Sequence, residues 1–109
     1  MKRTAVILAG IILAGMTCPV QGQHQADTWY FGMYAGVNFS TGAPAPLTDG
    51  MVYAPEGSAV AVDAVTGQLL FYTNGERIWN RNHDTMPGGT GLFGDGDATQ
   101  SAIILPKPG

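Results

Sequence analysis

An Asn-Gly pair, Asn74-Gly75, separates two short apolar runs, and no other local feature constrains the fold of this chain so strongly. The runs cover residues 69–73 and 78–79. Asn and Gly best tolerate the positive φ angles of a type I′ turn, so the pair predicts a β-hairpin. Residues 69–72 are apolar without alternation, which predicts a strand that is covered on both faces.

Short apolar runs between turn residues continue along the chain and predict an all-β, antiparallel fold. No window carries a helical period over ten residues, and 16 Gly and 7 Pro in 109 residues would make helices costly. Pro44 and Pro46 remove backbone donors, so the stretch around them is expected to be an edge strand or irregular. The other predicted strands are 29–31, 37–39, 58–62, 68–73, 77–80 and 100–105, of which 58–80 would form a meander.

Residues 1–22 are typical of a secretory signal peptide. A basic start precedes twelve apolar residues, 5–16, and small residues suit cleavage before Gln23. Twelve helical residues span about 18 Å, less than the roughly 30 Å of a bilayer core, which argues against a membrane span. A lipid anchor on Cys18 is the alternative.

The mature chain is expected to be acidic and free of cysteine. Cleavage before Gln23 leaves three basic and eight acidic side chains, a net charge of −5, and removes Cys18, the only cysteine. The negative charge disfavours nucleic acids and anionic membrane surfaces as partners. Export without disulfides fits a bacterial surface or extracellular protein.

Asp95-Gly96-Asp97 is the best candidate for a metal site, because two carboxylates in a flexible loop suit Ca²⁺. An EF-hand loop would continue with an oxygen ligand and a glycine, where this chain has Thr99 and Gln100. The match is therefore partial, and a solvated Asp-Gly turn is the alternative interpretation of Asp95 and Asp97.

His83, followed by Asp84, could serve as a general base or a metal ligand. No strained nucleophilic serine accompanies it, and His24 lies in the polar lead. A structural role is favoured, in which residues 79–83 order an outer strand and its turn.

Several aromatic residues suggest two roles, a carbohydrate-stacking face or packing within the β-sheets. Packing is the commoner role of aromatic side chains in β-proteins and is favoured here. The candidates for a stacking face are Trp29, Tyr30, Tyr34 and Tyr53, and those for the core are Phe71, Tyr72 and Trp79.

Residues 86–99 form a linker with five glycines, and a further strand is predicted at 100–105 before Pro106. Loops of this length commonly connect units or carry function. A unit that begins at residue 100 would be incomplete, so the chain is expected to be the opening of a larger protein.

An ordered series of motifs over residues 29–109 resembles the start of large surface proteins from gliding, type IX-secreting bacteria. The motifs are Trp29-Tyr30-Phe31-Gly32, Ala35-Gly36-Val37-Asn38-Phe39, Leu47-Thr48-Asp49-Gly50, Glu56-Gly57, Asp63, Gly67, Leu69-Leu70-Phe71-Tyr72-Thr73, Trp79-Asn80-Arg81-Asn82-His83, Met86-Pro87, Gly89-Thr90-Gly91-Leu92 and Gln100-Ser101-Ala102-Ile103-Ile104 before Pro106-Lys107-Pro108-Gly109.

The resemblance implies a β-propeller-like domain in which 58–80 is most of a first blade and 100–105 opens the second. It also implies PKD-type or other immunoglobulin-like repeats and a gliding motility-associated C-terminal sorting domain further on, which would engage the secretion machinery. Members often carry Cys soon after the Glu-Gly pair, where this chain has Ser58-Ala59.

The resulting expectation is a signal peptide at 1–22, a polar lead at 23–28 and a partial β-propeller-like domain at 29–109. The function expected is non-enzymatic: adhesion, recognition or matrix building at the outer-membrane surface or outside the cell, with glycan or protein partners. The alternatives are a secreted propeller enzyme, either quinoprotein-like or glycan-active, and a Ca²⁺-dependent binding module using Asp95 and Asp97.

Overall fold

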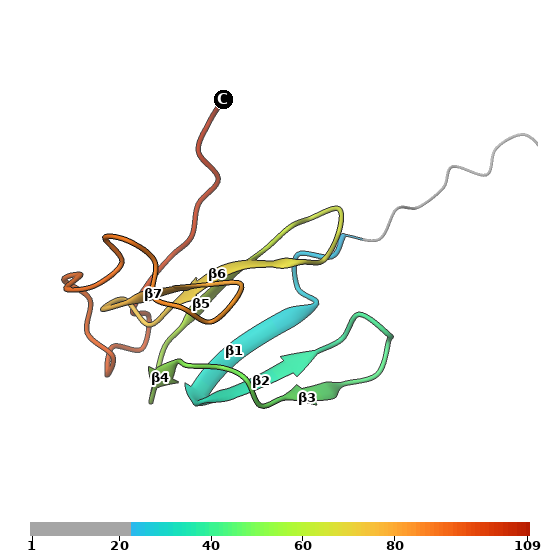
Figure 1. The fold of residues 1–109 in the computed structure, drawn as a ribbon, viewed down its shortest axis with the longest axis horizontal. Coiled ribbons are helices and arrows are strands. Elements are labelled where there is room, and N and C mark those ends of the chain that lie inside the picture. Colours follow the sequence, from blue (N-terminus) through green and yellow to red (C-terminus); the bar gives the residue numbers. More distant parts are fainter. Residues whose placement is uncertain (1–22) are drawn as a thin grey trace, which may run out of the picture.

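The computed structural model describes residues 23–109, which form two antiparallel β-sheets and no helix (Figure 1). The predicted all-β class is therefore confirmed. The first sheet has the order β3-β2-β1-β4 and the second the order β5-β6-β7. The strands are β1 Thr28–Met33, β2 Ala35–Asn38, β3 Ala45–Leu47, β4 Tyr53–Ala54, β5 Ala59–Val62, β6 Leu69–Thr73 and β7 Ile78–Asn80.

The predicted signal peptide and the alternative lipid anchor on Cys18 lie outside the described residues. Within residues 23–109, no helix has the length and apolar character needed to cross a membrane.

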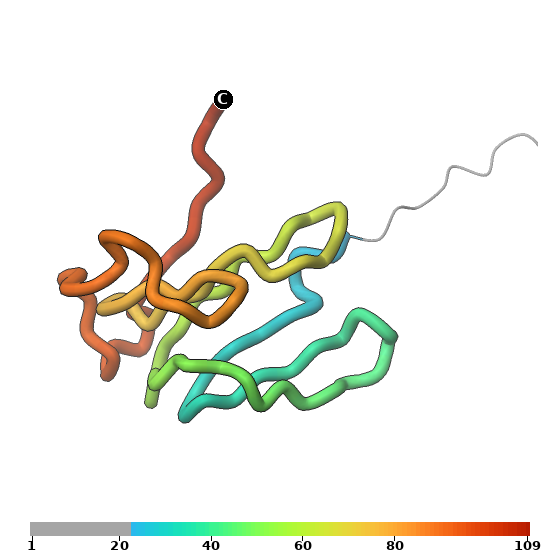
Figure 2. The backbone as a smooth tube through the Cα atoms, in the orientation of Figure 1, coloured from blue at the N-terminus to red at the C-terminus, as the bar shows by residue number. Residues whose placement is uncertain are grey.

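The predicted antiparallel meander is confirmed. β5, β6 and β7 follow one another in the chain and pair in that order, as the path of the tube in Figure 2 shows. In Figure 1 they lie above β1, β2 and β3, so the two sheets form two layers. The Ser58 hydroxyl donates to the Tyr30 carbonyl at 2.7 Å and ties the start of β5 to β1.

The expectation that β6 is covered on both faces holds at its end, where the adjacent Tyr72 and Thr73 are both buried, but not at Leu70. Ala61 pairs with Phe71 and Val62 pairs with Leu69, so Leu70 is the extra residue of a β-bulge. A bulge redirects the side chains of its strand, and Leu70 is exposed to solvent while Tyr72 is buried.

The predicted type I′ turn at Asn74-Gly75 is also wrong. Among residues 23–109 only Tyr34 and His83 are non-glycine residues with positive φ, so Asn74 does not adopt the required conformation. The Asn74 side chain instead closes a four-residue loop. Its Oδ1 accepts hydrogen bonds from the backbone N–H groups of Glu76 and Arg77, at 3.1 and 3.0 Å. This Asx arrangement satisfies the loop without a second left-handed residue.

The prediction of an edge strand near the prolines is confirmed, because β3 lies at the edge of the first sheet. Pro46 pairs with Val37 of β2. β4 was not predicted. It consists of two residues, Tyr53 and Ala54, and pairs only with the end of β1.

The strand predicted at 100–105 is wrong. Within the described chain this segment pairs with neither sheet and has no regular structure. An apolar run becomes a strand only where a sheet edge offers backbone partners. Here the segment lies over Gly57 and Gly75 instead, and the Ser101 hydroxyl donates to the Gly57 carbonyl at 2.7 Å.

The core is small and is built on three stacked aromatic rings. Tyr30 from β1 stacks on Tyr72 from β6 with ring centroids 4.8 Å apart, and Tyr72 stacks on Trp79 from β7 at 5.4 Å. Val52 and Ala54 complete the buried set, and partly buried apolar side chains pack around it. Stacked pairs of this kind contribute about 0.5–1.5 kcal/mol each beyond their burial. The stack therefore joins the two sheets.

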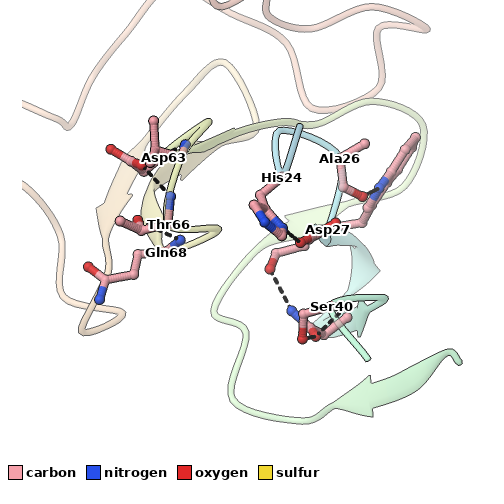
Figure 3. A network of polar contacts seen from close by, with 11 residues as sticks. His24, Ala26, Asp27, Ser40, Asp63, Thr66 and Gln68 are labelled. Carbon is pink, nitrogen blue, oxygen red and sulfur yellow. Dashed lines mark hydrogen bonds and ion pairs between the residues drawn. The ribbon is translucent and has the colours of Figure 1, made fainter. Parts of the chain in front are cut away.

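The polar lead packs against the turn that connects β5 to β6 (Figure 3). The His24 backbone N–H donates to the Ala64 carbonyl at 3.2 Å, and the His24 imidazole pairs with the Asp27 carboxylate at 2.6 Å. Asp63 holds the turn itself by accepting from the N–H groups of Val65 and Thr66. Gly67, with φ of 72°, lies close to the His24 and Asp27 side chains.

Candidate functional site: a polar network and an adjoining aromatic cavity

A chain of hydrogen bonds runs along the edge of the aromatic stack and connects the two sheets. The Tyr72 hydroxyl lies 2.9 Å from His83 Nδ1, and His83 Nε2 lies 3.0 Å from Asp49 Oδ2. The other carboxylate oxygen, Asp49 Oδ1, accepts from the Tyr30 hydroxyl at 2.8 Å. Two buried tyrosines, one imidazole and one carboxylate are thus linked in series.

The hydrogen-bond partners determine which atoms of this network carry the protons. The Met51 backbone N–H donates to the Tyr72 hydroxyl oxygen at 3.1 Å. The Asp49 carboxylate can only accept, so the neutral His83 imidazole donates from Nε2 and accepts from the Tyr72 hydroxyl at Nδ1. An imidazole that accepts at Nδ1 carries its proton at Nε2, and that proton faces Asp49. We assign the Nε2–H tautomer to His83 from this pattern.

A tight turn after β7 places His83. The His83 N–H donates to the Asn80 carbonyl at 3.0 Å, and Asn80 Oδ1 accepts from the N–H groups of Asn82 and Asp84. His83 sits in the left-handed region with φ of 66°, which brings its ring edge-on to Tyr30 at a centroid distance of 5.5 Å. Non-glycine residues in this region carry a conformational cost that surrounding contacts must offset.

The network shifts three ionisation equilibria. Burial, with help from the neighbouring Asp49, raises the pKa of Tyr30 far above its usual range. Burial also raises the pKa of Tyr72. For Asp49, partial burial raises the pKa, but hydrogen bonds from Tyr30, its own backbone N–H and His83 outweigh burial and lower the pKa below the ordinary value of 3.8. Both tyrosines are therefore neutral donors and Asp49 is ionised.

This arrangement binds the two sheets together through His83. Both imidazole nitrogens are occupied, one by Tyr72 and one by Asp49, so neither is free to face a substrate. Asp84, the adjacent acid in the sequence, makes no ion pair with His83 in the described part of the chain. The partner is Asp49, which the sequence offered only as part of an ordinary Thr-Asp-Gly turn.

A cavity of about 500 Å³ lies beside the network and is lined by Met51, whose N–H donates to Tyr72, and by Trp79, which stacks on Tyr72. Its wall combines aromatic and polar side chains from both sheets and from the loop after residue 90. The lining residues used below are Tyr34, Tyr53, Glu76, Arg77, Trp79 and Leu92.

The aromatic residues singled out in the sequence do not gather on one face. Tyr30 belongs to the core, as do Tyr72 and Trp79. Trp29 is exposed on the other face of β1, and its Nε1–H donates to the Ala26 carbonyl at 2.7 Å. Tyr34 and Tyr53 are half-exposed and line the cavity together.

Asp95 and Asp97, the predicted calcium ligands, lie in an exposed turn in which Asp95 Oδ1 accepts from the Asp97 N–H at 3.0 Å. With Glu76 they line a small pocket of about 200 Å³. In residues 23–109 no three His, Cys, Asp or Glu side chains are placed to share a metal ion. The use of Asp95 and Asp97 as calcium ligands stays a prediction.

Comparison with known proteins adds no relative from which a role could be transferred: no protein-family model, no curated protein and no solved structure matches this chain.

Proposed function

We propose that the chain is the N-terminal part of an exported bacterial cell-surface protein with a structural or adhesive role, of the kind that gliding, type IX-secreting bacteria display. In this proposal residues 1–22 direct export, and the two described sheets belong to a larger β-propeller-like domain. β5, β6 and β7 would be the strands of its first blade. The proposal rests on the sequence for export and on one feature of the fold for the larger domain.

That feature is the uncovered apolar face of the first sheet. Trp29, Phe31 and Met33 are exposed on β1, whereas Thr28 and Tyr30, which alternate with Trp29 and Phe31 along the strand, are buried. Val37 of β2 is paired with Trp29, which extends the apolar row to the neighbouring strand. Monomeric proteins rarely leave contiguous apolar patches of this kind in water.

A further β-sheet of the same protein fits this face best, because sheets pack face to face through such rows of side chains. The small core also supports a larger domain, since only five apolar residues are buried within the described residues. Domains with so little buried surface are marginal on their own. A larger β-domain would bury both the outer face of β1 and the exposed Leu70 of β6.

Export is tested by producing the protein in a Gram-negative host with type IX secretion and sequencing the mature N-terminus. We expect a chain that begins at Gln23 and fractionates outside the cytoplasm, since display on the cell surface would need the sorting domain expected further on. The matched control is Leu13→Arg, which interrupts the apolar stretch and should leave uncleaved protein inside the cell. An unprocessed wild-type chain in the cytoplasm would contradict the proposal.

The uncovered face is tested separately with the apolar dye ANS on the purified full chain. We expect dye fluorescence that falls strongly in Phe31→Lys. Val65→Lys is the control, because Val65 is an isolated exposed side chain at the turn between β5 and β6. Equal dye binding by wild type and Phe31→Lys would show that the outer face of β1 is not an uncovered apolar surface.

A further inference from the structure

We infer that the cavity beside Trp79 is a binding site for a neutral oligosaccharide. The inference deepens the proposed surface function, on which it rests for the setting in which a glycan is met. It is carried by the size of the cavity, the chemistry of its wall and the backbone conformation of Tyr34.

The cavity has the dimensions and composition of a small-molecule site. Its volume of about 500 Å³ lies within the range of roughly 300–1,000 Å³ that such sites occupy. Three aromatic rings converge on it from separate elements: Tyr34 from the hairpin between β1 and β2, Tyr53 from β4 and Trp79 from β7. The Tyr34 and Tyr53 ring centroids lie 6.2 Å apart with the planes tilted by 50°. Tyr34 and Tyr53 therefore form a cleft with the more buried Trp79.

Pyranose rings match such a wall because each has an apolar face of C–H groups and a rim of hydroxyls. The C–H face packs against aromatic rings, while the hydroxyls need charged or polar partners at the edge. Glu76 and Arg77 supply these partners, since a carboxylate accepts and a guanidinium donates paired hydrogen bonds. The Glu76 carboxylate accepts only a long bond of 3.4 Å from the Gly96 N–H in the described chain, and Arg77 has no ion-pair partner there.

The charges around the cavity disfavour an anionic ligand. Glu76 and Arg77 balance each other, and the adjacent small pocket, which shares Tyr53 and Glu76, adds the carboxylates of Asp95 and Asp97. Sugars that carry carboxylates or sulfates would be repelled by these acids. A quaternary ammonium ion, the other group that aromatic clefts select, would be attracted by the same acids, so choline is the competing ligand that the titration has to exclude.

The backbone at Tyr34 supports a dedicated role for its ring. Phe31 pairs with Ala35, so residues 32–34 form a three-residue hairpin loop. Tyr34 occupies its left-handed position, with φ of 61°, where glycine or asparagine is the unstrained choice. The Tyr34 N–H donates to the Val52 carbonyl at 2.8 Å, which holds this conformation. A bulky residue kept in a strained conformation beside a cavity is characteristic of a binding site.

The chain offers a direct reporter, because Trp29 and Trp79 are its only tryptophans. In full-length protein carrying Trp29→Phe, the fluorescence of Trp79 alone is followed during titration with cellohexaose and with chitohexaose. We expect a saturable change with at least one of them, with Kd in the range of about 10 μM to 1 mM. Polygalacturonate oligomers and choline serve as the charged probes and are expected to give no saturable change at the same concentrations.

Variants on the Trp29→Phe background separate binding from folding. Tyr34→Gly removes the ring and relieves the backbone strain, so it should weaken binding at least about tenfold without lowering the melting temperature. Tyr34→Phe keeps the ring and should bind within about threefold of the parent. Tyr53→Ala should also weaken binding, whereas Phe39→Ala, which removes an exposed aromatic side chain that does not line the cavity, should not.

Absence of a saturable response to both hexasaccharides at about 10 mM would overturn the inference. So would tighter binding of polygalacturonate or choline, or unchanged binding by Tyr34→Gly and Tyr53→Ala. The titration uses purified protein and is independent of export. Failure here with normal processing and export would remove the ligand class alone, and binding without export would remove the proposed location alone.

Discussion

His83 binds Asp49 across the two sheets, with Nε2 of the imidazole 3.0 Å from the carboxylate Oδ2. Asp49 belongs to the segment between β3 and β4, and His83 follows β7, so the contact joins the first sheet to the end of the second. Tyr30 and Tyr72, which stack on each other in the core, provide the outer two hydrogen bonds of the same network. The polar network and the aromatic stack therefore hold the same two sheets together.

The Tyr30 ring requires glycine at two neighbouring positions. A Cβ at Gly36 would lie 2.8 Å from Tyr30 Cδ1 and 3.0 Å from the Leu47 Cβ, and Gly50 is as close to the same ring. Tyr30 cannot move aside, because it is stacked on Tyr72 and bonded to Asp49. We expect Gly36→Ala to lower the free energy of unfolding by about 1–3 kcal/mol in urea denaturation.

The control for Gly36→Ala is Gly96→Ala, because a Cβ at Gly96 would meet only Glu76 Oε1 at 3.9 Å. That variant should unfold within about 0.5 kcal/mol of wild type. Equal stability of the two variants would mean that Tyr30 is not confined by Gly36.

Asn74 closes the loop between β6 and β7 with its side chain and is buried. Its Nδ2 also donates to the Tyr53 carbonyl at 3.0 Å, which connects the loop to β4. Asn74→Gly removes these three bonds and should cost about 1–3 kcal/mol of unfolding free energy. In a type I′ turn glycine would replace asparagine at little cost, so a neutral result would restore that interpretation. Asn82→Ala, at an exposed turn position, is the matched control and should be nearly neutral.

Stability should fall in acid through Asp49. Its pKa is lowered in the folded protein, so its contribution is present above the ordinary value of 3.8 and is lost as the pH falls through the folded pKa. Asp63, whose pKa is lowered chiefly by the Thr66 backbone N–H, acts in the same direction. We expect Asp49→Asn to flatten the dependence of the melting temperature on pH between about 5 and 2 without abolishing it.

Equal slopes for wild type and Asp49→Asn over that interval would contradict the assignment of Asp49 to this acid dependence. Asp63→Asn is the comparison variant in the same pH experiment, because the Asp63 carboxylate is bonded within its own turn and does not contact the Tyr30–His83 network.

Local patterns in the sequence predicted most of the strands but not how they assemble. The meander of β5, β6 and β7 follows from apolar runs and turn residues that are close in the chain. The two-residue β4 has no such pattern, since it exists only because the end of β1 extends past β2 and offers a partner. The run at 100–105 has the pattern of a strand and no partner. Pairing depends on edges that only the folded chain supplies.

The sequence predicts less of the candidate functional site than of the fold. The sequence marks His83 as a candidate base or ligand, but its partner Asp49 is distant in the chain and sits in an ordinary turn pattern. Tyr34 and Tyr53 stand out in the sequence as aromatic residues, yet their common cavity depends on the left-handed backbone at Tyr34. A left-handed tyrosine has no signature in sequence, because local propensity argues against it.

The bridge between the sheets is tested most directly by a double-mutant cycle on Asp49 and His83. The unfolding free energies of wild type, Asp49→Ala, His83→Ala and the double variant are measured in urea under identical conditions. The cycle cancels the effect of alanine at the left-handed position of His83, since that substitution occurs on both of its arms. A coupling energy of about 1 kcal/mol or more is expected for the contact, and single effects that add to within about 0.3 kcal/mol would contradict it.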